Sequence, residues 1–197
     1  MQPRQQSGSS LIEILVTIVV VVLGMLGLAG IHARLQTSEL ESYQRAQALM
    51  LLRDMSSRLS ANRTAADAYV LGAPASNTPL GAGATCNVAP ADTVQRDLAQ
   101  WCAALQGAAE VTGPTATRVG AMIGGRGCIE RPDPSAPEYR ITVVWQGLTP
   151  LTAPPATLRC GVDLYNATDG GACVNDLCRR YVTTTVRIAN LAAAVPP

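Results

Sequence analysis

Residues 1–31 constrain this chain more than any other stretch. A short polar leader, residues 1–8, precedes an apolar run over residues 11–31. A helix rises about 1.5 Å per residue, so about 20 apolar residues are enough to cross the hydrocarbon core of a bilayer. The exception in the run is Glu13, and a carboxylate at membrane depth is costly enough to mark a partner or a function. The sequence therefore predicts a membrane-spanning helix with one functional carboxylate near its start.

The small residue of the leader lies on the unusual side of the apolar run. A secretory signal is cleaved after its apolar segment, whereas here Gly8 precedes that segment and no clean small-residue site follows Ile31. Cleavage after Gly8 leaves the helix on the mature chain and gives Ser9 a free α-amine about one helical turn from Glu13. Such an amine, on the same chain or a neighbouring copy, offsets the burial of the carboxylate. Arg4 favours a cytoplasmic position for the uncut N-terminus.

Together these features resemble the prepilin signal of type IV pilins and pseudopilins. The resemblance is carried by Gly8, by Glu13 five residues past the cut, and by the apolar helix. It implies that a membrane prepilin peptidase cleaves between Gly8 and Ser9 and methylates the new N-terminus at Ser9. It also implies that Glu13 docks an incoming subunit onto its neighbour. The alternative is an uncleaved signal-anchor in which Glu13 is merely tolerated near the membrane surface.

The helix is expected to continue past the membrane. Residues 32–62 contain no Gly or Pro and are rich in good helix formers. The apolar residues of this part form two groups, whereas a helix that packs on a single domain shows one stripe. Two groups indicate a helix that carries a domain on one side and touches other subunits on the other, and the alternative is one broad core face. The first group is Leu40, Tyr43, Ala46 and Met50, and the second is Ala48, Leu52, Met55 and Leu59.

All six cysteines follow the membrane helix. An even count on a periplasmic side predicts up to three disulfides. Zinc is the alternative, but zinc sites favour closely spaced cysteine pairs with histidines nearby, and the only histidine is His32. The pairing stays open, with a preference for Cys173 with Cys178 because they are closest in sequence. The candidates are Cys86, Cys102, Cys128, Cys160, Cys173 and Cys178.

The rest of the chain predicts a short helix and several antiparallel strands. Asp92 is a candidate N-cap for an amphipathic helix that ends near Leu105 and carries Trp101. Strand patterns occupy residues 139–145 and 181–188, with a shorter strand at 157–161. Loops or turns are expected at residues 71–86, 120–127 and 147–155, and a frayed tail at 191–197.

The expected fold class is α+β. The order of elements resembles the pilin fold, in which a long N-terminal α-helix, transmembrane in its first half, packs on an antiparallel β-sheet domain, here with disulfides. The expected organisation is a leader (1–8), a transmembrane and filament-core helix (9–31), the soluble half of the helix (32–63) and a globular α+β domain (64–197). Residues 45–63, 97–101, 139–145 and 179–182 resemble stretches in minor pilins of the PilV kind.

Composition and motifs exclude several functions. The formal net charge is +1, without the clustered basic face of a nucleic-acid-binding protein. His32 lies at the membrane boundary, so a nucleophilic triad has no histidine base in the globular part. The glycines at 124, 125 and 127 lack the spacing and the lysine of a phosphate-binding loop. We therefore expect no catalytic residue, metal, cofactor or small-molecule substrate.

The resemblance implies a minor pilin that primes type IV pilus assembly at the tip and supports twitching motility or adhesion. Its implied partners are prepilin peptidase, other minor pilins, the major pilin and a large pilus-tip adhesin. The protein would reside in the bacterial inner membrane, with its globular domain periplasmic, and then in the pilus at the cell surface. Two alternatives remain, a type II secretion pseudopilin and a membrane-anchored periplasmic enzyme or receptor.

Overall fold

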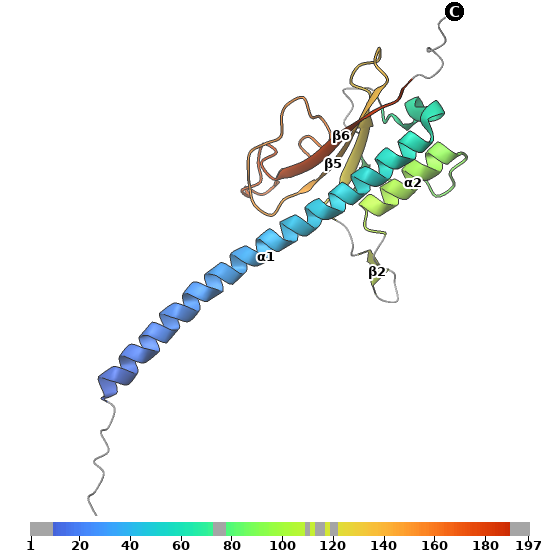
Figure 1. Cartoon of the computed structure of the whole chain (residues 1–197). Helices are drawn as coiled ribbons and strands as arrows, with labels where there is room; N and C mark the ends of the chain where they lie inside the picture. Colours follow the sequence, from blue (N-terminus) through green and yellow to red (C-terminus); the bar gives the residue numbers. More distant parts are fainter. Residues whose placement is uncertain (1–9, 73–77, 109–110, 113–116, 119–121, 190–197) are drawn as a thin grey trace, which may run out of the picture. The chain divides into compact units, whose positions relative to one another are not determined.

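The computed structural model describes residues 10–72, 78–108, 111–112, 117–118 and 122–189. It divides into two compact units, Met1–Leu40 and Glu41–Pro197. Helix α1 (Leu11–Ala61) contributes to both units (Figure 1). The predicted leader and C-terminal tail lie outside the described residues.

Helix α1 is long because nothing in its soluble half interrupts it. Glu13 lies in its first turn and Arg58 in its last, and both charges suit the helix dipole. The helix ends at Ala61, within the predicted stretch, and the N–H of Asn62 still donates to the carbonyl of Arg58. A 3-10 helix, η1 (Arg63–Tyr69), follows directly. The sequence had not indicated η1.

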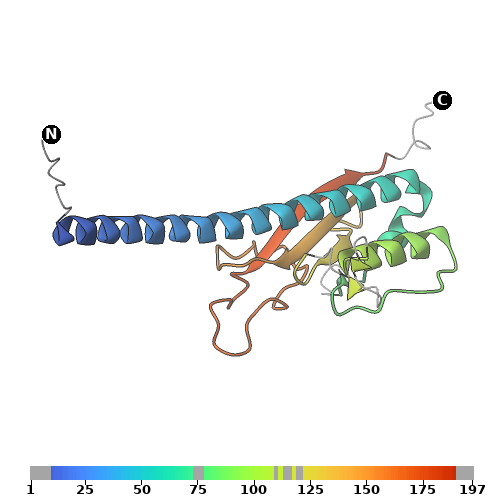
Figure 2. The same cartoon turned by 90° about the horizontal axis from the view of Figure 1, so that it is seen from below.

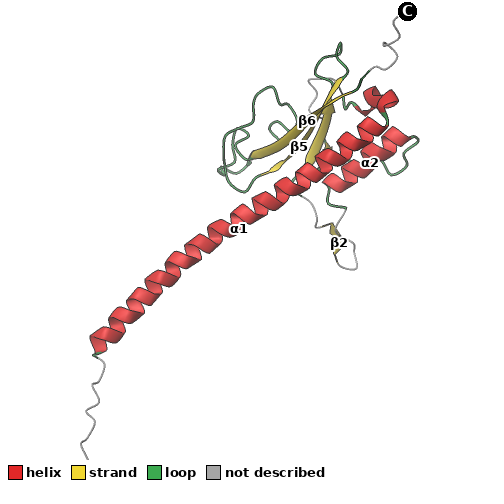
Figure 3. Ribbon diagram, viewed as in Figure 1, coloured by secondary structure: helices red, strands yellow, loops and turns green. Residues whose placement is uncertain are grey.

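The second unit contains a four-stranded antiparallel sheet with the order β1-β4-β5-β6. Helix α2 (Thr93–Leu105) begins directly after Asp92. The Asp92 side chain accepts from the N–H of Gln95, which confirms the predicted N-cap. Figure 3 shows α2 and the last part of α1 packed beside the strands of the sheet. The strands are β1 (Leu80–Gly81), β4 (Arg126–Glu130), β5 (Glu138–Gln146) and β6 (Arg179–Arg187), and a separate pair is β2 (Val111–Thr112) with β3 (Thr117–Arg118).

Strands β5 and β6 confirm the two main strand predictions, and three other expectations need correction. The loop expected at 71–86 contains β1, and the turn expected at 120–127 runs into β4. The strand expected at 157–161 is wrong, since this segment forms turns. It is held by a disulfide and by a buried arginine, described below, instead of by a ladder of backbone hydrogen bonds.

Both faces of the sheet are covered. Alternate residues of β5, from Tyr139 to Trp145, join the core formed with α1 and α2, as the period of two in a strand requires. On the other face, Cys128 and Val144 pack against Leu158, Cys160 and Tyr165 of the loop over residues 147–178. Figure 2 shows this loop, drawn in orange, on the side of the sheet away from α1.

All six cysteines form disulfides, as the even count predicted. The preferred pair, Cys173–Cys178, is confirmed. The other two pairs span 16 and 32 residues of sequence. They are Cys86–Cys102, which ties the segment before α2 to that helix, and Cys128–Cys160, which ties β4 to the 147–178 loop.

Tyr165 fastens the 147–178 loop to the sheet. Its hydroxyl donates to the carbonyl of Gly124 at 2.8 Å, and the guanidinium of Arg126 lies 5.0 Å from its ring centre. Burial raises the pKa of Tyr165 to about 12, against the opposing effect of Arg126. The folded protein therefore stabilises the neutral form of the Tyr165 side chain.

This pKa predicts a loss of stability at alkaline pH. The pKa of Tyr165 is higher in the folded chain than the value of about 10 in the unfolded chain. The neutral side chain therefore contributes about 2–3 kcal/mol to the unfolding free energy below pH 10, and this contribution disappears as the pH rises towards 12. We expect the unfolding free energy of Tyr165→Phe to fall less between pH 9 and 11.5 than that of the parent, in urea titrations. All six cysteines are already paired, so no free thiol starts disulfide exchange. Equal losses in both proteins would contradict the assignment.

Candidate functional site

The apolar half of α1 has no partner within the described chain. Every residue from 10 to 32 is exposed. Among the described helices, α1 alone is long and apolar enough to cross a membrane, with a mean hydropathy of 2.9 over its most apolar window. Burying one Val, Leu or Ile side chain gains about 1.5–3 kcal/mol, so exposure of this whole segment to water is strongly unfavourable. The segment requires lipid or other helices around it.

The glycines of this half are not required by packing within the described chain. A β-carbon placed on Gly24, Gly27 or Gly30 would meet nothing within 4 Å. Glycine is also a weak helix former, so these residues reduce helix stability with no gain that the described chain explains. Small residues let two helix backbones approach closely in a membrane. Their place on the exposed span suits contact with another helix.

Glu13 lies at the start of this span, and its side chain is exposed. Its N–H donates to the carbonyl of Ser10 at 2.8 Å, within the first turn of α1. The predicted cleavage and methylation positions, Gly8 and Ser9, lie outside the described residues. The pairing of Glu13 with a new N-terminus stays a prediction.

The soluble half of α1 has one buried and one exposed apolar face, as the two groups of residues predicted. Ala48, Leu52, Met55 and Leu59 are buried in the main core. Leu40, Tyr43, Ala46 and Met50 are exposed. The alternative of one broad core face is wrong, because the group that begins at Leu40 does not reach the core.

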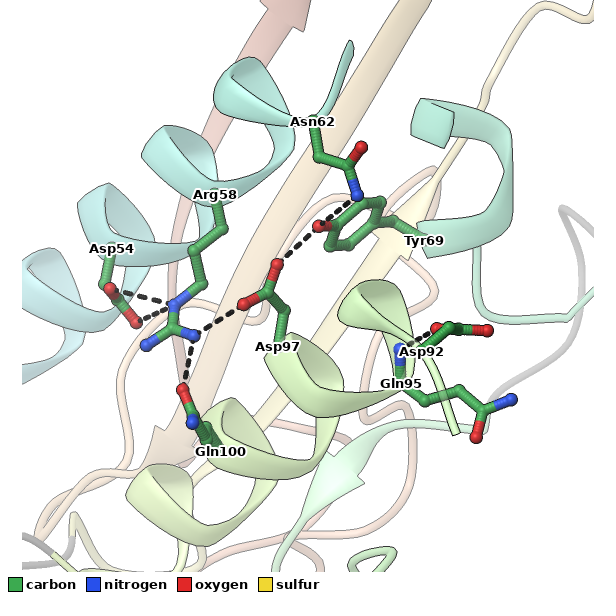
Figure 4. Close-up of polar contacts among 8 residues, drawn as sticks. All are labelled: Asp54, Arg58, Asn62, Tyr69, Asp92, Gln95, Asp97 and Gln100. Atoms are coloured by element: carbon green, nitrogen blue, oxygen red, sulfur yellow. Dashed lines mark hydrogen bonds and ion pairs between the residues drawn. The ribbon is translucent and has the colours of Figure 1, made fainter. Parts of the chain in front are cut away.

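A polar network fastens the last turns of α1 to α2 (Figure 4). Arg58 is its centre. Its Nε contacts both carboxylate oxygens of Asp54 at 3.0 Å, and its Nη1 donates to Asp97 at 2.8 Å and to Gln100 at 2.7 Å. Burial lowers the pKa of Arg58, but hydrogen bonds and charge from Asp54 and Asp97 outweigh burial and raise it. The network joins two helices through charges that are only partly exposed.

Tyr69 extends this network to η1. Its hydroxyl donates to the second oxygen of Asp97 at 2.5 Å and accepts from the side-chain amide of Asn62 at 3.3 Å. Burial, followed by the hydrogen bond to Asp97, raises the pKa of Tyr69. Asp97 thus connects three elements, and each of its oxygens has a donor. Sequence reasoning had singled out residues 45–63 and 97–101 by resemblance, and the structure shows that they contact each other.

A pocket at this end of the domain is lined by side chains that contact each other. It lies between η1, the start of β5 and the end of β6. Asp67 accepts there from Arg131 at 2.7 Å and from the hydroxyl of Tyr139 at 2.8 Å. These contacts hold η1 against the sheet. Over the described chain, no three His, Cys, Asp or Glu side chains gather as a metal site would require.

The comparison with known families gives one match. The model of the prokaryotic N-terminal methylation motif matches residues 3–29, a range that includes Gly8, Ser9 and Glu13. No curated protein and no solved structure matches the chain. The motif, the exposed apolar helix and the disulfide-bonded α+β domain support a type IV pilin or pseudopilin-type precursor.

The motif also bears on processing and location. It implies cleavage by a prepilin peptidase and a context of pilus-type assembly. With the apolar helix, it fits membrane anchoring followed by incorporation into a filament. It is typical of structural pilin-like subunits.

Proposed function

We propose that this chain is a minor pilin that initiates type IV pilus assembly at the tip, together with other minor pilins and a large adhesin. Prepilin peptidase cleaves it between Gly8 and Ser9 and methylates Ser9. Its globular domain is periplasmic before assembly and lies at the cell surface afterwards, where it serves twitching motility or adhesion. The observation that carries the proposal is the exposure of the apolar span of α1, which the methylation motif covers as far as residue 29.

The exposed span supports assembly because it can change its surroundings without unfolding the domain. It makes no contribution to the core of the second unit, whose helical residues all come from later in the chain. Lipid tails and other helices are about equally apolar, so transfer between them depends on close packing and polar pairs. Close packing is possible at Gly24, Gly27 and Gly30. The polar pair is formed by Glu13 and the amine of Ser9. The exposed face that contains Leu40, Tyr43 and Met50 continues this contact beyond the membrane.

A minor pilin is favoured by the resemblance of residues 45–63 and 97–101 to the PilV kind. These are the two stretches that the Arg58 and Asp97 contacts bring together. The second candidate, a type II secretion pseudopilin, shares the N-terminal motif. Deletion of the gene separates them, because a minor pilin affects piliation and a pseudopilin affects the export of secreted proteins.

Removal of the Glu13 charge tests the assembly role. Breaking a buried ion pair costs about 3–5 kcal/mol, so we expect Glu13→Ala to lower recovery in sheared pili at least about tenfold. Insertion in the inner membrane should not change, because the substitution makes the span more apolar. Immunoblots of the membrane and sheared-pilus fractions measure both quantities.

The matched control is Glu39→Ala, which removes the same charge from an exposed position of the same helix. It should assemble as the parent does. Mass spectrometry of the mature chain should find a methylated Ser9 in Glu39→Ala. If Ser9 methylation is lost at all, it should be lost in Glu13→Ala alone. Normal recovery of Glu13→Ala in pili, or native material that begins at Met1, would refute the proposal.

A further inference from the structure

Residues 41–47 of α1, which we call the strap, are held on the domain in an unusual way. They form about two helical turns, and none of them belongs to either hydrophobic core cluster. The first residue of α1 in the core is Ala48. Burial of apolar surface is the main force that fixes one element on another. The strap must therefore be held by other contacts.

Glu41 fastens the strap to the 147–178 loop and to the start of β6. Its Oε1 accepts from the N–H of Leu148 at 3.1 Å and from Nη2 of Arg180 at 3.3 Å. The side chains of Glu41 and Arg180 are 27 % and 14 % exposed. An ion pair that water still reaches contributes little to stability, so the attachment that Glu41 provides is weak.

Arg180 keeps its place without Glu41. Its Nη2 also donates to the carbonyl of Thr149 at 2.6 Å, and its Nη1 donates to the carbonyl of Leu177 at 3.1 Å. A β-carbon on Gly147 would overlap the guanidinium, so the backbone there lies close against Arg180. The loss of Glu41 as a partner therefore leaves the loop and the start of β6 in order.

Docking of the strap leaves buried polar atoms without partners. Gln44 is buried, and its side-chain oxygen accepts no hydrogen bond from the described residues. The side-chain oxygen of Gln47 is likewise buried and unpaired, although its Nε2 donates to the hydroxyl of Tyr43. An unpaired buried acceptor destabilises the state that contains it. Release of the strap returns both oxygens to water and so recovers part of what the Glu41 contacts contribute.

The next turns of α1 are held much more firmly. Leu52 and Met55 are buried in the main core. Arg58 pairs with Asp97 of α2 at 2.8 Å. Release of these turns would expose the core, whereas release of the strap exposes no residue of it. The boundary between a weakly held and a firmly held part of α1 therefore lies at Ala48.

We propose that the strap is a releasable attachment, which leaves the domain when Glu41 gives up Arg180 while the rest of the domain stays folded. The helix leaves the domain at Glu41 in the docked state and at Ala48 in the released state. These seven residues are about 10 Å of helix, so release lengthens the connection between the domain and the apolar span. The inference does not depend on Glu13 or on the methylation motif, so it can fail while the proposed function stands.

The N–H of Leu148 is a direct probe of release, because Glu41 is its acceptor. The neighbouring N–H of Gly147 is the internal control, since it donates to the carbonyl of Cys178 at 2.7 Å. Amide hydrogen exchange of the full-length chain in detergent is followed by NMR. We expect Leu148 to be protected at least about tenfold less than Gly147, because local opening frees only the first of these amides.

Two substitutions should shift the balance in opposite directions. Glu41→Gln keeps an oxygen for Leu148 but removes the ion pair, so this amide should exchange at least about threefold faster. Gln44→Leu replaces the unpaired amide with an apolar side chain of similar size, so docking should strengthen and the Leu148 amide should exchange at least about threefold slower. Glu39→Gln removes the same charge from an exposed position of α1 and should leave the exchange of Leu148 and Gly147 unchanged.

Trypsin provides a second measurement, because α1 has an exposed arginine in each of the two parts. Arg45 lies in the strap, and Arg53 lies in the part that is fixed to the core. Initial cleavage of the intact chain should be at least about tenfold faster after Arg45 than after Arg53. Cleavage after Arg45 should accelerate in Glu41→Gln and slow in Gln44→Leu, while cleavage after Arg53 stays the same.

Three results would overturn the proposal. The first is equal protection of Leu148 and Gly147, which would show that the strap opens only when the loop opens. The second is equal initial cleavage after Arg45 and Arg53 in the parent chain. The third is exchange at Leu148 that Gln44→Leu does not slow, which would show that the unpaired amide does not weaken docking.

Discussion

Replacement of Trp101 by alanine should cost about 3–5 kcal/mol of unfolding free energy, as truncation of a large aromatic core residue does. Trp101 is fully buried between α1 and the sheet. Its indole N–H donates to the carbonyl of Leu51 at 3.0 Å, so it joins α2 to the last third of α1. A domain has about 5–15 kcal/mol of stability in total, so this loss is a large part of it. Chemical unfolding followed by circular dichroism measures the change.

The two tryptophans of the chain provide an internal comparison. Trp145 is also buried in the main core, but its indole N–H has no partner in the described structure. Trp101→Phe loses a hydrogen bond worth about 0.5–1.5 kcal/mol, whereas Trp145→Phe removes a buried donor that is already unpaired. We expect Trp101→Phe to be the more destabilising of the two. The opposite order would show that the bond to Leu51 does not hold α2 in place.

The elements with a clear period were predictable from sequence. Helix α2 has an Asp92 cap and an amphipathic pattern, and β5 and β6 alternate in strand fashion. These signals are local, because each is contained in the spacing of residues within one element. The two faces of α1 were visible for the same reason.

Strand β4 was not predictable in this way, and Gly127 explains why. Four of its five residues are buried, so the strand has no alternation of apolar and polar residues. A β-carbon on Gly127 would overlap the ring of Trp101, so glycine marks a close approach here and not a turn. From the sequence alone, the glycines of this segment predicted a turn. The close approach could not be predicted, because Trp101 lies 26 residues earlier in the sequence.

The candidate site also has features that the sequence alone predicts and features that only the fold creates. The apolar span and Glu13 are features of one continuous segment, and sequence alone indicates them. The Arg58–Asp97 contact and the Cys128–Cys160 disulfide join residues that only the folded domain brings together.

Arg179 is the second residue whose loss should be severe. Its side chain is buried, and Nη1 donates to the carbonyls of Leu158 at 2.9 Å and Cys160 at 2.8 Å. Nη2 lies 3.2 Å from a carboxylate oxygen of Asp176. One guanidinium thus joins residues 158–160, where the sequence had predicted a strand, to Asp176 near the end of the 147–178 loop. Arg179→Met leaves a buried carboxylate and two carbonyls without their donor, and removing one partner of a buried pair costs about 3–5 kcal/mol.

A second substitution shows whether the uncompensated charge is the cause. Asp176→Asn removes the charge and keeps an oxygen that accepts from the N–H of Asp163. Asparagine also tolerates the positive φ of 60° at this position. The double variant should therefore recover at least about 1 kcal/mol of the loss in Arg179→Met. Limited proteolysis reports the loop itself, and cleavage within residues 147–178 should follow the same order, fastest in Arg179→Met and slower in the double variant. If Asp176→Asn restores nothing, Arg179 organises the loop through its two carbonyl contacts and not through the ion pair.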